Sequence, residues 1–512
     1  MPASTLREKI MDKRRFKRGA GVLCHISSLP GPYGIGSLGS TAYKFVDFLA
    51  KSKVKYWQIL PLVQTGYGDS PYQSVCCNSG NPYFIDLERL AKEGLLTEEE
   101  LEGARMPAGR VNYGELYKSR YATLRTAFSR FDISTPEFKE FVNSGLFDYY
   151  ALFMSLKTRY GGTFRDFPRA YKHREGLAVS EFRRNNYANE YCFWQFLQFE
   201  FMRQWKALKA YANANGIQLI GDIPLYVAAD SSDVWAHPEL FLVDEDLNPT
   251  AVAGVPPDYF SATGQLWGNP LYDWDYAKST GYRWWIDRFA HAYELYDIVR
   301  LDHFRGFDRY YAVPAGAPTA ESGEWRNGPG LELFEAAERA LGHLNIIAED
   351  LGVIDDGVVA LRSATGFPGM KIMLFAFDGN EGNDYLPQHI TENSVTYTGT
   401  HDNDTAYGFV KDMPHERFEH FKKQVRAALR YEGVSYPLVT RTEAARALVK
   451  CALGSRSDIC IIPIQDVLGL DNSARMNVPS VPSGNWQFRL EEVPGRQVAA
   501  WLRNAVKSSA RL

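Results

Sequence analysis

The sequence is poor in cysteine, and its cysteines show no spacing typical of a structural cross-link. No CxxC pair occurs in the 512 residues, and two of the cysteines are adjacent. The six are Cys24, Cys76, Cys77, Cys192, Cys451 and Cys460. This distribution fits neither a disulfide framework nor a zinc site, and a chain of this length can bury a large core without either. We therefore expect reduced thiols in a cytoplasmic protein.

Long apolar runs and an excess of basic residues are also missing. No run approaches the ~18 consecutive apolar residues of a membrane span. The formal net charge is −4, whereas a nucleic-acid-binding domain is usually basic. The N-terminus is locally basic but has no apolar stretch of the secretory type, and Glu8 and Asp12 argue against a transit peptide. We expect no membrane partner and no nucleic-acid partner.

Aromatic residues, in contrast, are plentiful. They make up 14% of the chain, with 30 Tyr, 30 Phe and 11 Trp. Core packing accounts for most of them. Carbohydrate sites also use Trp and Tyr, because the apolar faces of sugars stack on aromatic rings. Composition alone favours the core over a sugar site.

Eight short apolar runs recur along the chain, and several of them are continuous rather than alternating. Continuous runs are typical of parallel strands that are covered on both faces. The runs lie at 21–26, 55–60, 217–224, 296–303, 344–350, 369–375, 393–400 and 458–464. Helical patterns alternate with them, as at 196–216, which ends in Asn-Gly directly before a run. The alternation predicts an α/β protein with a (β/α)8 TIM barrel.

The spacing of the runs is uneven, which predicts insertions into this barrel. The interval between residues 60 and 217 is too long for a structureless connection. Its amphipathic patterns predict a mostly helical subdomain over 85–205. A second insertion, 225–290, is rich in Pro, Gly, Asp and Trp and reads as a loop or helical segment that includes an active-site lid at 254–270. We expect one catalytic barrel over 1–512, without a C-terminal β-domain.

Acidic residues stand at the ends of four predicted strands. They are Asp222, Asp302, Glu349 and the pair His401-Asp402. Active sites of such barrels lie at the C-terminal ends of the strands. Arg300 shares a strand face with Asp302, because side chains two residues apart point the same way. A neighbouring Arg keeps a carboxylate anionic, which suits a nucleophile, although a buried structural ion pair has the same pattern.

The other two acids are ambiguous when taken singly. Glu349 adjoins Asp350, and the apolar run before them does not decide which one points into the barrel. Asp402 lies among Gly, Thr and Asn, where an ordinary turn is the alternative. Clustered Asp and His can also bind metal, but no HExxH, EF-hand loop or HxH strand occurs. We expect no metal.

As a set, the acids fit glycoside chemistry. Retaining glycosidases need two carboxyl groups ~5–5.5 Å apart, one as nucleophile and one as acid/base. Neighbouring strands lie ~4.8 Å apart, and Asp302 and Glu349 end consecutive strands. Asp402 and His401 are then placed to hold sugar hydroxyl groups.

Seven long stretches carry a family resemblance. They are SPYQSVCCNSGNPYFIDLERL (70–90), IGDIPLYVAADSSDVWAHPELF (220–241), GVPPDYFSATGQLWGNPLYDW (254–274), VRLDHFRGF (299–307), IIAEDLG (346–352), TGTHDNDT (398–405) and RMNVPSVPSGNWQFR (475–489). Together they resemble the 4-α-glucanotransferases called amylomaltase or disproportionating enzyme. That family belongs to the α-amylase-like barrel enzymes and has helical insertions but no C-terminal β-domain.

The resemblance implies roles for individual residues. Asp302 would be the nucleophile, Glu349 the general acid/base and Asp402 the stabiliser of the transition state. Arg300 and His401 would support them. Tyr72 and Asp222 would line the site of the donor sugar. The substrates would be maltooligosaccharides and other α-1,4-glucans, and no cofactor or metal would be needed.

The predicted lid bears on whether a sugar or water completes the reaction, because transfer and hydrolysis share a covalent intermediate. Pro256 and Pro257 stiffen the segment, and a loop that excludes water favours a sugar acceptor. A structural Ω-loop that packs its own rings is the alternative. The substrate-binding residues expected in it are Tyr259, Phe260, Trp267, Asn269 and Pro270.

Three functions are compatible with a glucan site of this kind: a transferase, a hydrolase and a glucan-binding protein. Residue chemistry alone does not separate a transferase from an amylase-like hydrolase, and the resemblance favours the transferase. A non-catalytic glucan-binding protein would need a broken acid set, whereas all three acids are present. The chain departs from the family at Ser480, where Gly is expected, at Phe488, often Trp, and at the SVCC stretch 74–77. These departures bear on glucan length rather than on activity.

Overall fold

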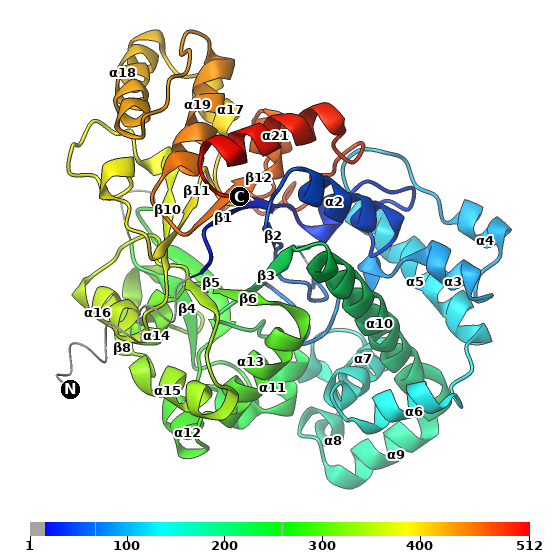
Figure 1. Cartoon of the computed structure of the whole chain (residues 1–512). Coiled ribbons are helices and arrows are strands. Elements are labelled where there is room, and N and C mark those ends of the chain that lie inside the picture. The colour runs from blue at the N-terminus through cyan, green and yellow to red at the C-terminus, as the bar shows by residue number, and fades with distance from the viewer. Residues whose placement is uncertain (1–15, 67, 258–260) are drawn as a thin grey trace.

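The computed structural model describes residues 16–66, 68–257 and 261–512. Eight parallel strands lie at the centre of the molecule (Figure 1). They are β1 (Gly19–Leu23), β2 (Tyr56–Gln58), β3 (Gln218–Ile223), β6 (Ile298–Leu301), β9 (Ile346–Ala348), β10 (Gly369–Ile372), β11 (Ser394–Tyr397) and β12 (Ile459–Pro463). Each overlaps one of the eight predicted apolar runs.

These strands form a barrel that is nearly closed. Their order around the sheet is β10-β11-β12-β1-β2-β3-β6-β9. The two end strands meet where the backbone N–H of Ala348 donates to the carbonyl of Pro368 at 2.9 Å. The predicted (β/α)8 barrel is therefore confirmed.

Helices surround the barrel, which explains why the strands are apolar on both faces. The long ones on its outer side are α2 (Ser40–Lys51), α10 (Cys192–Ala214), α13 (Arg283–Leu295), α15 (Gly330–Leu341), α16 (Asp356–Thr365), α19 (Arg441–Gly454) and α21 (Arg496–Ser508). Side chains of the strands fill the interior of the barrel or pack under this layer. Trp57 of β2 and Ile347 of β9, for example, have no exposed surface.

The helical insertion after β2 stands on one side of the barrel (Figure 1). Its helices are α3 (Leu87–Lys92), α4 (Glu98–Gly103), α5 (Tyr113–Arg130), α6 (Pro136–Asn143), α7 (Asp148–Tyr160), α8 (Arg169–Lys172) and α9 (Gly176–Asn186). Short polar residues begin several of them. The side chain of Asp86 accepts from the N–H of Arg89 at 2.9 Å, and Thr97 and Glu100 form a reciprocal capping box. The 23-residue helix α10 returns the chain to the barrel at β3.

A second sheet was not predicted from the sequence. It is antiparallel, with the order β5-β4-β7-β8. Its strands are β4 (Ala251–Val255), β5 (Gln265–Pro270), β7 (Arg309–Pro314) and β8 (Glu324–Asn327). The described part of the segment expected as a lid loop is thus a β-hairpin, in which Val255 pairs with Gln265. Gly254 in β4, and Gly268 and Pro270 in β5, interrupt the alternating pattern of this hairpin.

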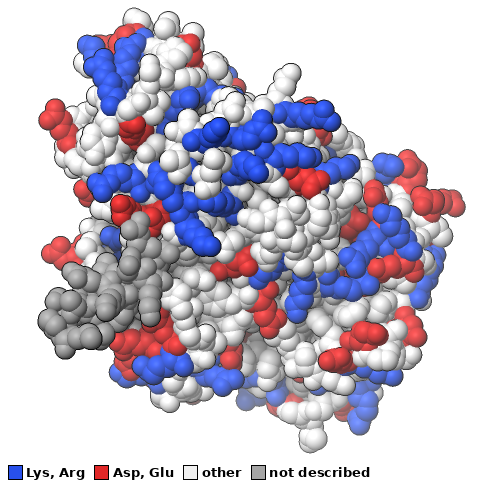
Figure 2. All heavy atoms as spheres, viewed as in Figure 1, with Lys and Arg blue, Asp and Glu red and all other residues white. Residues whose placement is uncertain are grey.

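The charges on the surface are unevenly distributed. On the face drawn in Figure 2, Lys and Arg side chains gather along α21, whereas Asp and Glu are spread over the rest. Within the described ranges, no helix has both the length and the hydrophobicity that crossing a membrane requires.

Candidate active site

Four strand ends of the barrel bring the predicted acids together. Asp222 lies near the end of β3, Asp302 follows β6, Glu349 follows β9, and Asp402 lies in the loop after β11. Asp222 and Arg300 are register partners on neighbouring strands. Because paired positions of parallel strands share a face, both side chains point to the inside of the barrel.

Arg300 joins two of the acids through one nitrogen. Its Nη1 donates to both oxygens of Asp222, at 2.9 and 2.8 Å, and to Oδ1 of Asp302 at 2.9 Å. Arg300 is 4% exposed and Asp222 2%. Burial of such charges is costly, and their pairing offsets the cost. Burial raises the pKa of Asp222, while Arg300 acts against that rise.

Asp302 differs from Asp222 in that it reaches solvent. Its side chain is 26% exposed, whereas the side chain of Asp222 is fully covered. One oxygen of Asp302 is held by Arg300, and no hydrogen bond within the described part of the chain is found for Oδ2. The buried structural pair is therefore Arg300 with Asp222, and Asp302 adds an accessible carboxylate beside it.

Glu349 has the properties of a proton donor. Its Oε2 accepts from the backbone N–H of His303 at 2.7 Å, and its Oε1 accepts from that of Leu351 at 3.1 Å. Loss of water around the carboxyl raises the pKa of Glu349 to about 8; Arg300 lowers it and Asp302 raises it. A carboxyl group with this pKa is largely protonated at neutral pH and can act as a general acid.

The neighbouring acid, Asp350, points to another part of the structure. Its Oδ1 accepts from the backbone N–H of Met370 at 2.7 Å, and its Oδ2 lies 3.1 Å from Nε of Arg362. Asp350 thus connects β9 to β10 and α16. The structure places Glu349, and not Asp350, beside Arg300 and Asp302.

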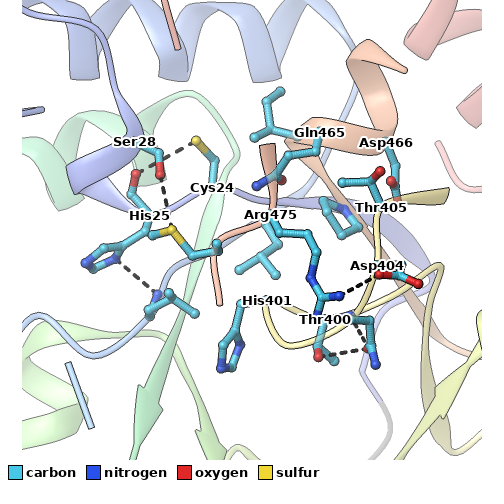
Figure 3. Close-up of a pocket in the computed structure, with 16 residues that line it drawn as sticks. Cys24, His25, Ser28, Thr400, His401, Asp404, Thr405, Gln465, Asp466 and Arg475 are labelled. Carbon is cyan, nitrogen blue, oxygen red and sulfur yellow. Dashed lines mark hydrogen bonds and ion pairs between the residues drawn. The ribbon is translucent and has the colours of Figure 1, made fainter. Parts of the chain in front are cut away.

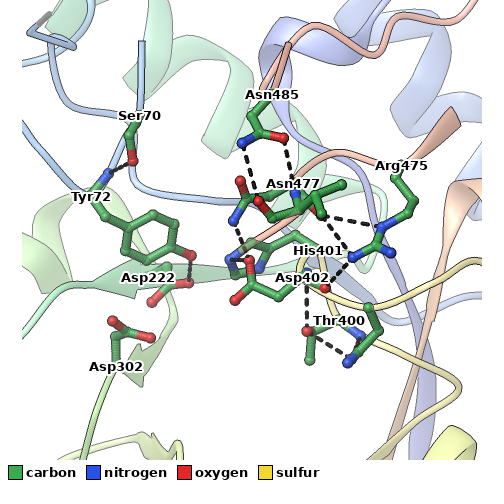
Figure 4. Close-up of polar contacts among 12 residues, drawn as sticks. Ser70, Tyr72, Asp222, Asp302, Thr400, His401, Asp402, Arg475, Asn477 and Asn485 are labelled. Atoms are coloured by element: carbon green, nitrogen blue, oxygen red, sulfur yellow. Dashed lines mark hydrogen bonds and ion pairs between the residues drawn. The ribbon is translucent and has the colours of Figure 1, made fainter. Parts of the chain in front are cut away.

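Tyr72 reaches the site from the loop that follows β2. Its hydroxyl donates to Oδ2 of Asp222 at 2.8 Å (Figure 4). Its ring stacks on His401, with 5.2 Å between centroids and 14° between planes. Trp486 lies 5.8 Å from both rings. Segments far apart in the sequence thus form one wall of the site.

Asp402 is held by the segment near the C-terminus. Nδ2 of Asn477 donates to its Oδ1 at 2.6 Å, and Nη2 of Arg475 donates to its backbone carbonyl at 2.8 Å (Figure 4). Nε2 of His401 lies 3.3 Å from the same Oδ1. Arg475 also pairs with Asp404 at 2.5 Å. The loop is therefore fixed by specific partners, unlike an ordinary exposed turn.

Arg475, Asn477 and Trp486 are site residues that could not be predicted from the sequence. The motif at 475–489 was recognised, but nothing in it indicates which strand end it meets. The only local signal is an Arg and an Asn two residues apart in a stretch without strand or helix periodicity. Their position against Asp402 follows from the tertiary structure alone.

The residues expected in the lid lie in different places. The ring of Trp267 in β5 stands edge-on to the ring of His303, 4.8 Å away at 81°. Asn269 donates to the carbonyl of Val227 at 2.8 Å and accepts from Nε2 of Gln73 at 3.0 Å. Pro270 is buried as the register partner of Val252 in the second sheet. Tyr259 and Phe260 lie outside the described residues.

A hollow opens beside His401 at the ends of β1, β11 and β12 (Figure 3). It has about 450 Å³ of empty space, part of it open to solvent. Its polar lining includes His25, Ser28, Asp404 and Gln465. In the part of the chain that the structure describes, no three His, Cys, Asp or Glu side chains are grouped to hold a metal ion. The reactive groups that the site presents are carboxyl groups.

Comparisons with known proteins agree on one group. A family model described as 4-alpha-glucanotransferase matches residues 24–494. A 4-alpha-glucanotransferase of Streptococcus pneumoniae is 45% identical over 93% of this chain and 94% of that protein. One of Thermus thermophilus is 45% identical over 97% of this chain and 99% of that protein. The solved structure of amylomaltase from Streptococcus agalactiae in complex with acarbose superposes with a TM-score of 0.90, at 38% identity, covering 97% of this chain and all of that one.

Removal of the buried partner of Arg300 should destabilise the protein. We expect Asp222→Ala to lower the free energy of unfolding by roughly 3 kcal/mol, because a buried guanidinium then keeps a single acid partner. Urea denaturation measures this as a lower midpoint. Asp402→Ala is the matched control, since the Asp402 side chain is 42% exposed. A midpoint of Asp222→Ala equal to that of the control would contradict the account of the ion pair.

Proposed function

This chain belongs to the 4-alpha-glucanotransferase family, and we propose that Asp302, Glu349 and Asp402 carry out its reaction. That reaction transfers an α-1,4-glucan segment from a donor glucan to the 4-hydroxyl group of an acceptor. The anomeric configuration is retained, through a covalent glucosyl–aspartate intermediate. The observation that supports the assignment best is the pair formed by the accessible carboxyl group of Asp302, bound to Arg300, and the carboxyl group of Glu349, with its raised pKa, on neighbouring strands.

In the first step, Asp302 attacks the anomeric carbon of the donor with its free oxygen. A bond forms between that carbon and Asp302, and the bond from the same carbon to the glycosidic oxygen breaks. Glu349 gives its proton to the departing oxygen, which leaves as the 4-hydroxyl group of the released glucan. Arg300 holds one oxygen of the nucleophile, and its other partner, Asp222, holds the guanidinium in place.

In the second step, Glu349 acts as a base. The acceptor's 4-hydroxyl group attacks the anomeric carbon and gives its proton to Glu349, and Asp302 leaves as a carboxylate. A pKa of about 8 allows Glu349 to release a proton in the first step and recover one in the second. The enzyme returns to its starting protonation state.

The remaining site residues would hold the donor sugar. Asp402 presents an exposed carboxylate, and Asn477 holds one of its oxygens. We propose that it accepts hydrogen bonds from sugar hydroxyl groups as the ring distorts toward the oxocarbenium ion. His401 and Tyr72 would complete this wall, and Trp267 offers a ring for stacking. Tyr259 and Phe260 remain proposals from the sequence.

Further features of the protein are proposed on the same basis. The Streptococcus agalactiae relative is a complex with acarbose, which supports maltooligosaccharides and related α-1,4-glucans as the partners of this chain. Carboxyl groups supply all the proton transfers, so the proposed reaction needs no metal or cofactor. All six cysteines are free thiols, which supports a cytoplasmic location. We propose one catalytic unit over 1–512, with 85–205 as a helical subdomain and 225–290 as the insertion bearing the lid.

Transfer and hydrolysis give different products from maltotriose. We expect the protein to convert maltotriose into glucose and a ladder of longer maltooligosaccharides, because a sugar hydroxyl group reaches the intermediate ahead of water. Chromatography of the products over time measures this. An exclusive appearance of shorter sugars would favour an amylase-like hydrolase and contradict the transferase.

The role of Glu349 predicts a dependence on pH. Only the protonated form donates a proton, so kcat/KM for maltotriose should be high below the pKa of Glu349 and fall as the pH rises through about 8. Glu349→Gln should reduce turnover by roughly 10²- to 10⁴-fold while glucan binding, measured by calorimetry, persists. A normal rate in this variant would overturn the assignment.

A further inference from the structure

The chain turns sharply directly after the nucleophile. β6 ends at Leu301, and His303, two residues later, has a φ of +51°. This left-handed conformation is unfavourable for a residue with a Cβ atom, so something must compensate for it. The turn directs the N–H of His303 at Oε2 of Glu349, at 2.7 Å, and that of Phe304 at the Glu349 carbonyl, at 3.0 Å. Glu349 is thus held by the residues that follow Asp302.

The ring of His303 is enclosed by three parts of the structure. The Trp267 ring in β5 lies edge-on to it at 4.8 Å, and the Tyr226 ring after β3 lies 6.3 Å away. On a third side the chain continues into α14 (Arg305–Asp308), where a Cβ at Gly306 would come within 3.1 Å of the imidazole. Removal of water by these neighbours lowers the pKa of His303 to about 4, so the imidazole is neutral at neutral pH.

We propose that His303 is a positioning residue for Glu349: its ring, held against Trp267, keeps the turn left-handed and so directs the backbone N–H at the acid/base. This inference rests on the proposed role of Glu349. It links the β4–β5 hairpin to proton transfer by way of His303. Trp267 then has two roles, because the ring that stacks on the sugar also supports the turn at His303.

Substitutions can separate the contribution of the His303 ring from that of the left-handed turn. Asn adopts the left-handed conformation more readily than most other residues. His303→Asn therefore loses the ring but tolerates the turn, whereas His303→Ala loses both. Trp267→Leu removes the support and leaves His303 in place. Trp274→Leu is the matched control, because the Trp274 ring packs on Tyr272, Trp285 and Phe307, and among the described residues the rings found against His303 are those of Trp267 and Tyr226 instead.

The test compares two donors. Maltotriose needs a protonated leaving group, whereas the fluoride of α-maltosyl fluoride departs without a proton from Glu349. We expect His303→Ala to lower kcat/KM for maltotriose at least about tenfold, with less than about a threefold loss in the burst of fluoride release. His303→Asn should recover most of the loss. A structural defect would impair both donors alike, and that result would overturn the proposal.

The pH profile supplies an independent readout. The hydrogen bond from the N–H of His303 stabilises the carboxylate form of Glu349 and so lowers its pKa. Loss of this hydrogen bond should therefore raise the pKa and move the alkaline limb of kcat/KM to higher pH in His303→Ala and Trp267→Leu. The titratable groups found to act on Glu349 or to share its surroundings in the described part of the chain are Arg300, Asp302 and Tyr385, and these variants leave them and the N–H of Leu351 unchanged. Arg305 acts on His303 and is also retained. An unmoved limb in both variants, or a moved limb in Trp274→Leu, would contradict the proposal.

Failure of this inference and failure of the proposed function give different results. If Glu349 is the acid/base, Glu349→Gln spares fluoride release relative to maltotriose turnover. If Glu349→Gln shows this difference and His303→Ala does not, the positioning role is wrong and the function stands. If neither variant shows it, the role of Glu349 is wrong, and the positioning role fails with it.

Discussion

The site depends on one buried guanidinium. Arg300 holds Asp222 on one strand and Asp302 at the end of its own, so a single cation fixes two acids and the distance between two barrel strands. Without this cation the two carboxylates would repel each other in a poorly hydrated space. With it, Asp222 becomes a buried structural partner and Asp302 remains accessible. Glu349, on the next strand, lies in a poorly hydrated position that favours its protonated form, although Arg300 acts against this.

The second constraint is the convergence of distant segments on the acids of this site. Tyr72 covers Asp222 from the loop after β2, and its ring meets His401 and Trp486. Asn477, near the C-terminus, holds Asp402. Such contacts order loops that have no secondary structure of their own, because each polar group finds a buried or half-buried partner. The barrel supplies the positions of the acids, and these loops supply their orientation.

Much of this architecture could be predicted from the sequence, for identifiable reasons. The barrel strands were found because strands covered on both faces leave continuous apolar runs, and their acidic ends stand out against those runs. The local pattern could not decide between Glu349 and Asp350, and only the family resemblance favoured Glu349, because the choice depends on the partner strand that offers Met370 to Asp350. The second sheet was missed because β4 pairs with β7 across a long interval of sequence and local patterns do not encode pairing. The contact between Asn477 and Asp402 was missed because it, too, joins segments far apart in the sequence.

The central claim is that Asp302 forms the covalent bond to the sugar. The most direct measurement uses Glu349→Gln with α-maltosyl fluoride, because the fluoride leaves without an acid while the second step lacks its base. Digestion and mass spectrometry of the stalled protein should then find the maltosyl group on the peptide that contains Asp302. A maltosyl group on another residue, or release of maltose of inverted configuration without any adduct, would contradict the account.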